Sequence, residues 1–568
     1  MIKADLKIIN GQIYNTFTRQ FAAKEVAIVD GKFFQIADKL SDDFKFKDIL
    51  DLKGSYVIPG LIDSHMHIES SMATPTNFSE TAIRFGTTTV IADAHEIANT
   101  SGIKGLKRFM DQPSLIDTFF AIPSSVPSTN PELETTGGII DLEEAKELLA
   151  DPRIICLGEA MNFKGITSEP NSLIRKIIAL CQKKRPRMPL EGHVPNISKE
   201  DLAKFIFAGI LSDHTQQTPA LIKEKIENGM FIQLQKKSLN KENIETIVKN
   251  HFYDYSALVT DDTMADDLIN GHLNSIIKLA VKCGLPLEWA IYMTTYTPAQ
   301  HMHFQDRGVI APGKIADFVV LNNLDGFSIK NVYKRGVPID KLSIDDEKPF
   351  ASEEYHSIHV PNRSAKDFTL RVSKDLKKIT ANVIEIAAKG TFTKAVKKEL
   401  LVKDGIVDWQ KAGLALLAVQ ERYGKTGQLT LALVSKSINK SGAIATTWAH
   451  DHHNLMVLGT NPDSMAIAYD KVASQQGGYL VVKDKEIVAN VQLPIAGIIS
   501  DEPIDIIGHK LKKVRLAMKD LGYVNTNEIM SLSTLSLLVS PSIKVSDKGI
   551  FMLKLKLKYL YCWQGKNE

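Results

Sequence analysis

Alternating polar and apolar residues in the first 55 positions predict short β-strands. Residues 4–15 (ADLKIINGQIYN) and 24–38 (KEVAIVDGKFFQIAD) each place apolar runs on both sides of an Asn-Gly or Asp-Gly pair. Such pairs favour two-residue hairpin turns, because both residue types accept positive φ angles. We therefore expect two hairpins, with turns at Asn10 and Gly11 and at Asp30 and Gly31.

From residue 56 onward, short apolar runs alternate with amphipathic segments. Helical periodicity marks residues 76–85, 141–150, 172–184, 199–208, 266–284 and 286–302. Eight apolar runs accompany them: YVIPGLIDSH, TTTVIADAH, DTFFAIPSS, RIICLGEA, MPLEGHV, ILSDH, GMFIQLQ and SALVTDD. Eight strand–helix units in about 250 residues are typical of a (β/α)8 TIM-like barrel. The predicted fold class is therefore α/β, with the barrel over residues 56–304.

Strand-like sequence returns at 306–335 and resembles the first 55 residues in character. We expect residues 1–55 and 305–345 to pair into one small β-domain that flanks the barrel. A stretch rich in Pro, Lys, Asp and Glu then marks a boundary, and residues 346–568 are predicted to form a C-terminal α+β domain. Alternating Leu and Lys in the tail, 549–568, are consistent with an extra edge strand or with an unselected extension.

Composition narrows the functional class. The 568 residues carry 69 Lys and Arg against 66 Asp and Glu, a net charge of +3, which gives no argument for a nucleic-acid or membrane partner. Four scattered cysteines form no CxxC pair, as expected of a chain in the reducing cytoplasm. The N-terminus lacks the apolar core of a signal peptide, and no stretch of about 18 apolar residues exists. The expectation is a soluble cytoplasmic enzyme.

Polar side chains gather where the eight apolar runs end. In a (β/α)8 barrel these ends meet at one face, which carries the catalytic groups. The residues at those ends are His65 and His67, His95 and Glu96, Ser124, Glu159, His193, His214, Gln233 and Gln235, and Asp261. Two histidines two residues apart on a strand share a face, so both imidazoles can reach one ion. Imidazole with carboxylate suits zinc, manganese or iron, and the donor set does not choose among them.

Each of these residues also has a purely structural interpretation. A lone HxH pair is often only hydrogen-bonded, and Glu159 fits a salt-bridged core carboxylate. For Asp261 the alternative is a helix N-cap, which suits Asp262 better. His95 and Glu96 have two equally good interpretations. His95 is a metal ligand and Glu96 a carboxylate that contacts the substrate, or the two form a hydrogen-bonded pair that supports the ligands without binding metal.

These motifs together resemble the adenine deaminases of the amidohydrolase superfamily. The resemblance covers about residues 4–550. It rests on VIPGLIDSHMHIESSM, GTTTVIADAHEIAN, LGEAMNF, GHVP, SDH and TDD in the barrel, with PSSVPST, ETTGG, DRGVIAPGKIADFVVL, AHDHHNLMVLGTN and LPIAGIISDEP elsewhere. HIESSM and HEIAN are much more specific than the bare PGxIDxHxH of the superfamily. The last two segments resemble the characteristic C-terminal domain of that family.

The resemblance implies a binuclear metal site and a reaction. His65, His67, His193, His214 and Asp261 match metal-binding positions, and Glu159 matches the carboxylate that bridges two ions. The implied metal is Mn2+, with Fe2+ or Zn2+ as alternatives. The implied reaction converts adenine and water into hypoxanthine and ammonia, with Asp261 moving protons. From their positions at strand ends, His95, Glu96 and Gln235 are the candidate substrate-binding residues. The expected partner is a purine base, and we expect a homo-oligomer.

Some positions depart from the family pattern. Mild changes place Ala94 where a Pro is expected and Ser125 where a Cys is expected. Larger ones place Gln235-Lys236-Lys237-Ser238 where Arg-Glu-Gly-Ser is common, and Thr263-Met264 where Arg or Lys and then His are common. These changes fall where a substrate edge would be recognised, so we expect Gln235 to donate a hydrogen bond to the purine.

Two other functions are consistent with the same residues. One is an amidohydrolase acting on a different base or a cyclic amide, although such relatives often use a carboxylated lysine where this chain has Glu159. The other is a metal-binding pseudoenzyme, which would be expected to lack Asp261. The polar run from His450 to His453 is interpreted as a loop that caps the active site, or alternatively as a second metal site.

Overall fold

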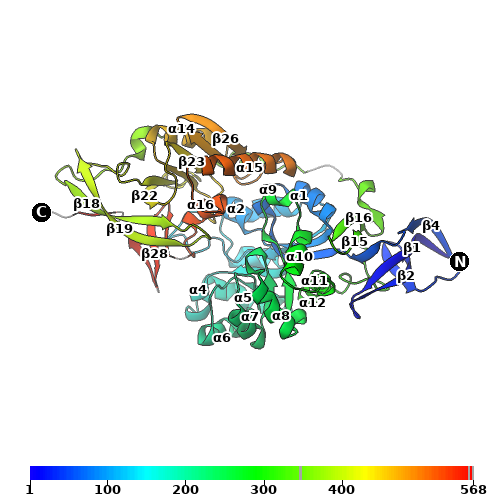
Figure 1. The fold of residues 1–568 in the computed structure, drawn as a ribbon. Helices are drawn as coiled ribbons and strands as arrows, with labels where there is room; N and C mark the ends of the chain where they lie inside the picture. Colours follow the sequence, from blue (N-terminus) through cyan, green and yellow to red (C-terminus); the bar gives the residue numbers. More distant parts are fainter. Residues whose placement is uncertain (345–347, 541, 555, 561–562, 566–568) are drawn as a thin grey trace.

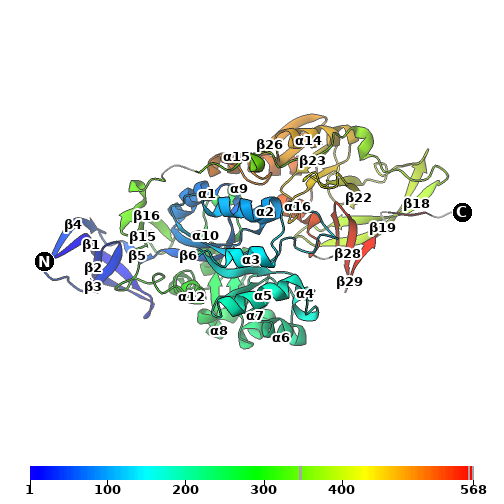
Figure 2. The same cartoon turned by 180° about the vertical axis from the view of Figure 1, so that it is seen from behind.

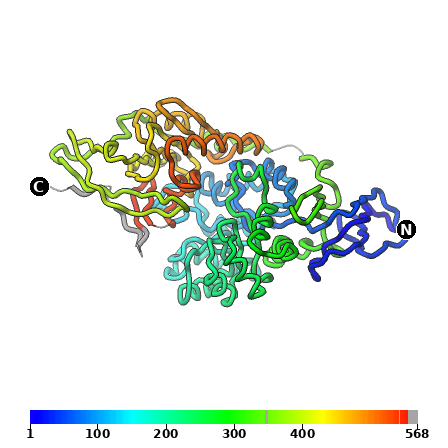
Figure 3. Tube along the Cα trace, viewed as in Figure 1, coloured from blue at the N-terminus to red at the C-terminus, as the bar shows by residue number. Residues whose placement is uncertain are grey.

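A computed structural model describes residues 1–344, 348–540, 542–554, 556–560 and 563–565. Figures 1 and 2 show a central unit of parallel strands and helices, with a β-sheet at one end and a larger domain at the other. In Figure 3 the N-terminus lies at one end of the molecule and the C-terminal domain at the other. No helix in the described ranges is both long and apolar enough to cross a membrane.

The N-terminal sheet combines strands from two distant parts of the chain. Strand β5 lies between β1 and β15, parallel to the first and antiparallel to the second. The order is β17-β16-β15-β5-β1-β2-β3, and β4 pairs with β1. The strands are β1 (Ile2–Asn15), β2 (Gln20–Val29), β3 (Lys32–Ala37), β4 (Phe44–Asp51), β5 (Tyr56–Pro59), β15 (Phe318–Asn323), β16 (Ser328–Lys334) and β17 (Val337–Pro338).

One of the two predicted hairpin turns is wrong. Asp30 and Gly31 do connect β2 to β3, but Asn10 and Gly11 lie inside the single strand β1, where the register with β2 shifts. Asn10 has a φ of 56°, and a Cβ on Gly11 would lie 2.1 Å from the Leu52 Cδ1 atom. The pair therefore forms a bulge that lets Leu52 pack against the strand, because a bulge uses the same positive φ as a turn.

The eight apolar runs of the central unit become parallel strands, and the first and last runs are divided. The first run supplies β5 to the N-terminal sheet and β6 to the central unit. Two sheets result, in the orders β10-β9-β8-β7-β6-β14 and β11-β12-β13. The strands are β6 (Leu61–His67), β7 (Thr87–Ala92), β8 (Asp117–Ile122), β9 (Ile154–Ala160), β10 (Leu190–Gly192), β11 (Ser212–Asp213), β12 (Phe231–Leu234), β13 (Ser256–Leu258) and β14 (Asp261–Asp262).

Each stretch with predicted amphipathic periodicity contains a helix, and residues 95–110, 163–168, 219–227 and 241–249 are helical as well. In α5, Ile174, Ile177, Ile178 and Cys181 are buried at the spacing of one helical face, and the Ser172 hydroxyl caps the first turn. The helices of the unit are α1 (Pro75–Ala82), α2 (His95–Met110), α3 (Leu142–Leu148), α4 (Phe163–Ser168), α5 (Leu173–Lys184), α6 (Lys199–Phe207), α7 (Pro219–Glu227), α8 (Lys241–Lys249), α9 (Ala265–Leu268), α10 (Leu273–Lys282), α11 (Leu287–Tyr292) and α12 (Tyr296–His301).

The C-terminal domain is built on a ten-stranded sheet in the order β20-β19-β18-β22-β21-β24-β23-β25-β26, with β30 also paired to β18. A second sheet joins β27, β28 and β29. The strands are β18 (Lys378–Ile386), β19 (Thr393–Lys403), β20 (Ile406–Val407), β21 (Ala415–Gln420), β22 (Leu429–Ser435), β23 (Gly442–Thr446), β24 (Leu455–Gly459), β25 (Gly478–Lys483), β26 (Glu486–Gln492), β27 (Ile543–Ser546), β28 (Gly549–Lys554), β29 (Lys556–Leu560) and β30 (Trp563–Gly565). The helices are α13 (Ser352–Tyr355), α14 (Pro462–Ser474), α15 (Ile504–Asp520) and α16 (Glu528–Ser533).

Both faces of the large sheet are covered, which strand β21 shows clearly. All of its residues are buried: Ala415, Leu417 and Val419 join one apolar cluster, and Leu416 and Ala418 join another. Successive side chains of a strand point to opposite faces, so each cluster lies on its own side of the sheet. Helix α14 packs in the second cluster and α15 in the first.

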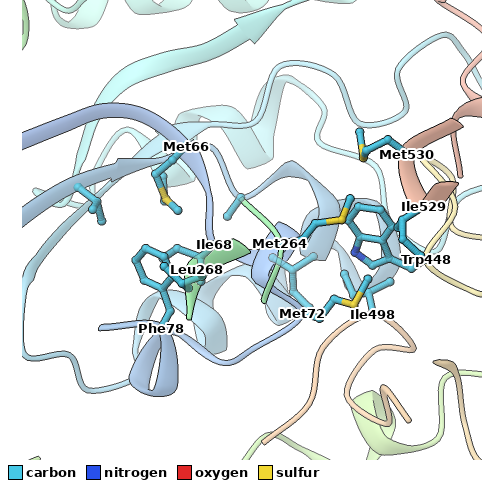
Figure 4. Close-up of a cluster of buried hydrophobic side chains, with 14 of the residues drawn as sticks. Met66, Ile68, Met72, Phe78, Met264, Leu268, Trp448, Ile498, Ile529 and Met530 are labelled. Atoms are coloured by element: carbon cyan, nitrogen blue, oxygen red, sulfur yellow. The ribbon is translucent and has the colours of Figure 1, made fainter. Parts of the chain in front are cut away.

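The first of these clusters continues into the central unit. Figure 4 shows Met66, Phe78 and Met264 of the central unit in one group with Trp448 and Ile498 of the C-terminal domain. Burial of apolar surface is the main favourable contribution to folding, so cutting the chain near residue 350 would expose this face to water. The central unit and the C-terminal domain therefore share a core.

Candidate metal centre

The strand ends bring six of the predicted residues together. His65 and His67 end β6, Glu159 lies near the end of β9, His193 and His214 directly follow β10 and β11, and Asp261 begins β14. Because all these strands are parallel, their carboxyl ends lie at one edge. We call His65, His67, Glu159, His193, His214 and Asp261 the central cluster.

Glu159 occupies the middle of this cluster. Its Oε2 atom lies 2.6 Å from His193 Nδ1 and 2.9 Å from His214 Nε2, and its Oε1 atom lies 3.7 Å from His67 Nε2. Asp261 Oδ1 completes the other side, 3.4 Å from His67 Nε2 and 3.8 Å from His65 Nε2. Oε2 of Glu159 thus faces the imidazoles of His193 and His214, and Oε1 faces that of His67. A carboxylate that bridges two ions needs one oxygen directed to each side in this way.

The donor atoms are suited to metal ions. Within the described residues, the combinations His65–Glu159–His214, His65–His67–Asp261 and His67–His95–Glu159 each bring three ligand atoms within 4.8 Å of one another. His65 Nε2 faces Asp261 and is buried without a hydrogen-bond partner in that part of the chain. Buried polar atoms are normally satisfied, so this orphan nitrogen together with the mixed N and O donors fits divalent ions.

Charge in the cluster is set by burial and by the close pairs. Burial tends to raise the pKa of Glu159, but His193 and His214 outweigh it and hold that pKa well below its usual range. Burial likewise opposes ionisation of Asp261, but His67, Lys237 and His214 lower its pKa well below the ordinary value. Burial lowers the pKa of His65 to about 3. Two carboxylates and at least one neutral imidazole are therefore present at neutral pH, as metal ligation requires.

Two carboxylates that the sequence interpretation missed hold the ligands in place. Asp93 accepts a hydrogen bond from the Glu159 backbone N–H at 2.6 Å, and its own carbonyl oxygen lies 2.9 Å from His67 Nδ1. Asp213 accepts from the backbone N–H groups of Val194 and Thr215, the residues that follow His193 and His214. Both precede histidines at strand ends, Asp93 by two positions and Asp213 by one, and that spacing was the available signal.

Not every residue at a strand end lies in the cluster. Ser124 donates to the Glu159 carbonyl oxygen at 2.9 Å, and Gln233 contacts Ser64 and Glu191. The expectation that Asp262 is a helix N-cap is wrong, because it accepts from the Ser70 hydroxyl at 2.7 Å and Met264 precedes helix α9.

Gln235 lies beside the cluster and contacts Asp261. Its Nε2 donates to Asp261 Oδ2 at 2.5 Å and to the His214 carbonyl oxygen at 3.1 Å. Gln235 also lines a cavity of about 640 Å³ between the central unit and the C-terminal domain, together with Asp262, Arg515 and Glu528. Lys236 and Lys237 are largely exposed, with Lys237 Nζ 3.9 Å from Asp261 Oδ2.

The polar run after β23 lies against the first turn of α2. Both His450 Nδ1 and His453 Nε2 make close ion-pair contacts with the Glu96 carboxylate, one with each oxygen. His450 Nδ1 also lies 3.5 Å from Asp451 Oδ1. We call Glu96, His450, Asp451 and His453 the loop cluster. It joins the C-terminal domain to the strand-end edge of the central unit, the position expected of a cap.

Glu134, beside the loop cluster, carries a prediction on pH. Burial raises its pKa from 4.5 to about 7, against hydrogen bonds from Thr129 and Ser128, and Asp451 raises it further. Between pH 4.5 and 7 the folded chain keeps a proton that the unfolded chain has lost, so this residue makes the free energy of unfolding fall as pH rises through that window. Glu134→Gln removes that penalty, and its melting temperature should match wild type near pH 4.5 and exceed it above pH 7.

The matched control for that measurement is Glu132→Gln, at an exposed position of the same loop, which should leave the pH dependence unchanged. Thermal unfolding followed by circular dichroism at both pH values is the measurement. A constant difference between Glu134→Gln and wild type from pH 4.5 to 8 would contradict the prediction.

Comparison with known proteins extends these observations over almost the whole chain. Residues 56–339 match the amidohydrolase family, and residues 390–556 match the adenine deaminase C-terminal domain. The chain is 98% identical over 558 residues to adenine deaminase 2 of Oenococcus oeni, covering 98% of each chain. It is 52% identical to the adenine deaminase of Lactobacillus delbrueckii subsp. bulgaricus, again covering 98% of each, and 47% identical to that of Clostridium perfringens strain 13, covering 97% and 98%. The central cluster and the similarity over the full length lead to one conclusion: the chain belongs to the adenine deaminases of the amidohydrolase family.

Proposed function

We propose that this chain hydrolyses adenine to hypoxanthine and ammonia. The observation that carries the proposal is the 98% identity, over 98% of both chains, to a protein named adenine deaminase 2. The central cluster supports it, because all six of its residues are present and the Glu159 carboxylate lies within 4 Å of His67, His193 and His214. The cellular role that follows is purine salvage in the cytoplasm.

The proposed architecture is a closed (β/α)8 barrel over 56–304, with 1–55 and 305–345 as the small β-domain and 346–568 as the C-terminal domain. Two contacts support closure of the barrel. Leu211 N–H donates to the Leu190 carbonyl oxygen at 3.3 Å, between β10 and β11. At the other junction, β13 pairs with β12 and the chain then continues into β14, which pairs with β6.

The proposed metal site is binuclear, with Mn2+ favoured over Fe2+ or Zn2+ on the family resemblance. His65, His67 and Asp261 would hold one ion, His193 and His214 the other, and Glu159 would bridge them. Divalent ions in such a site lower the pKa of a bound water and so supply a nucleophile at neutral pH. Full burial of Glu159 and His214 excludes bulk water from these ligands.

The remaining chemistry falls to residues of this chain. Because its pKa is held low, Asp261 is an ionised base at neutral pH, able to accept the proton of the attacking water and return it to the departing amine. Gln235 holds Asp261 Oδ2 in position through its amide. His95 lies beside the cluster, with its Nδ1 3.6 Å from Glu159 Oε1, and is proposed to face the purine. Glu96, whose two oxygens contact His450 and His453, is proposed to orient His95 from behind.

A substrate panel tests the proposal. The protein, reconstituted with Mn2+, is incubated with adenine, 6-substituted purines, cytosine and cyclic amides, and ammonia and base products are quantified. We expect ammonia and hypoxanthine in equal amounts, with adenine the best substrate. Ammonia from another base but none from adenine would overturn the adenine assignment and leave a metal-dependent deaminase of different specificity.

Gln235→Ala should reduce turnover of adenine about 10- to 100-fold. A hydrogen bond to a charged group contributes about 1.5–3 kcal/mol, and each 1.4 kcal/mol corresponds to a tenfold change in rate. If Gln235 acts by positioning Asp261, adenine and 6-substituted analogues lose rate equally; if it binds the purine edge, adenine loses more. Lys236→Ala is the matched control, since among the described residues its exposed ammonium pairs only with exposed Asp267, and we expect less than about a twofold change.

A further inference from the structure

We propose that the loop cluster, together with His95, binds an additional divalent transition-metal ion, separate from the two positions of the central cluster. Its ligands would be His95 and Glu96 of the central unit and His450 and Asp451 of the C-terminal domain. The ion would fasten the loop between β23 and β24 to the first turn of α2.

The donor atoms converge on one point. Both His450 Nδ1 and His95 Nε2 approach the same oxygen, Glu96 Oε1, the latter at 3.5 Å. Asp451 Oδ1 lies 3.5 Å from His450 Nδ1. The ligand atoms of His95, Glu96 and Asp451 all lie within 4.8 Å of one another. Two imidazole nitrogens and two carboxylate oxygens form a donor set suited to Zn2+, Mn2+ or Fe2+.

Several atoms of this group lack partners. In the described part of the chain, Asp451 Oδ2 is buried and forms no hydrogen bond; His450 Nε2 is also without a partner, but it is not the nitrogen that faces Glu96. Asp451 is 3% exposed and Glu96 is 1% exposed. Leaving a buried carboxylate oxygen unsatisfied costs free energy, because no water replaces the lost hydrogen bonds. A bound cation would remove this penalty.

Among the described residues, the ion pairs of Glu96 and Asp451 involve histidines and no lysine or arginine. The nearby Arg422 guanidinium instead donates to the carbonyl oxygens of His453 and Ala496 and to the Ser357 hydroxyl. Neutralisation of Glu96 and Asp451 must therefore come from protons on the histidines or from a metal ion.

His95 separates the two metal regions. Its Nδ1 lies 3.6 Å from Glu159 Oε1 of the central cluster, and its Nε2 lies 3.5 Å from Glu96 Oε1. One imidazole thus offers a nitrogen to each side. An ion held at Nε2 would fix the orientation of this ring, so that closure of the C-terminal loop and the geometry beside Glu159 would depend on the same ion.

Metal counting and anomalous diffraction on the full-length protein test the proposal independently of deaminase activity. After loading with Mn2+ and removal of free metal, we expect three ions per chain in wild type and two in Asp451→Asn. Crystals measured at the manganese edge should show an anomalous peak between Glu96 and Asp451. That peak should persist in His193→Ala, which loses metal from the central cluster.

His452→Gln is the matched control. His452 belongs to the same loop, but its Nδ1 accepts from the Asn454 backbone N–H and it lies outside the ligand set, so three ions should remain. If Asp451→Asn fails to fold, the metal count and the anomalous peak of the wild-type protein still test the proposal. Two ions per chain in wild type and no anomalous peak at Glu96 would overturn the proposal and assign the neutralising charge to protonated histidines.

Discussion

Replacing Asp261 by asparagine should lower kcat for adenine by about 10²- to 10⁴-fold, the range expected when a positioned general acid–base group is lost. The amide keeps the shape of the side chain and one ligand oxygen, but it cannot accept a proton from water. Metal analysis of the same preparation separates this loss from loss of a ligand, because five other residues of the central cluster remain. Steady-state kinetics on samples of matched Mn2+ content is the measurement.

Asp262→Asn is the control for that experiment. Asp262 is the next residue, and its side chain accepts a hydrogen bond from the Ser70 hydroxyl. Its backbone pairs with that of His67, but among the described residues its carboxylate forms no hydrogen bond or ion pair with a histidine of the central cluster, so we expect turnover within tenfold of wild type. If Asp261→Asn retained wild-type turnover with full metal content, the proton-transfer role would have to be assigned to another group.

Lys225→Met should destabilise the protein by about 3–5 kcal/mol, the usual cost of leaving one partner of a buried ion pair without the other. Lys225 and Asp213 are both fully buried, with Nζ and Oδ2 2.6 Å apart. Asp213 in turn accepts backbone hydrogen bonds from Val194 and Thr215. We therefore also expect weaker metal binding at His193 and His214, because the uncompensated Asp213 would shift both loops.

The same helix offers a matched control. Lys223 lies two positions earlier on α7 and pairs with Glu227 at 3.7 Å, with both side chains more than half exposed. Exposed pairs contribute about 0–1 kcal/mol, so Lys223→Met should have little effect. Chemical denaturation and metal content of both variants are the measurements. Equal stability of the two variants would show that the buried pair is not what holds the His193 and His214 loops.

The strand-end residues illustrate what a linear pattern can predict. His65 and His67, Glu159, His193, His214 and Asp261 each follow an apolar run, and parallel strands must place their carboxyl ends at one edge. Their proximity therefore follows from topology alone. The spacing along the chain carries no information about which oxygen of Glu159 faces which imidazole, because that depends on side-chain rotamers and on Asp93 and Asp213 behind them.

Local patterns fail where a distant segment decides the outcome. Asn10 and Gly11 have the composition of a hairpin turn, yet Leu52, some forty residues away, packs against Gly11 and the strand continues as a bulge. The eighth apolar run reads as one strand, but it divides between β13 and β14 because its end pairs with β6. In both cases a long-range contact outweighs a local preference.

The amino-acid sequence by itself determined the alternation of strands and helices over residues 56–304, the candidate ligands and the family, because hydrophobic periodicity and ligand motifs are local properties of the chain. Only the tertiary structure decided how Glu96 is used: His450 and His453 lie more than 350 positions away, and folding of the C-terminal domain onto the central unit brings them to its carboxylate. It also decided that the two parts share an apolar core, which no local pattern reveals. The physical reason is that apolar burial and ion pairing depend on which side chains are close in space, and residues far apart in the sequence become neighbours only when the chain folds.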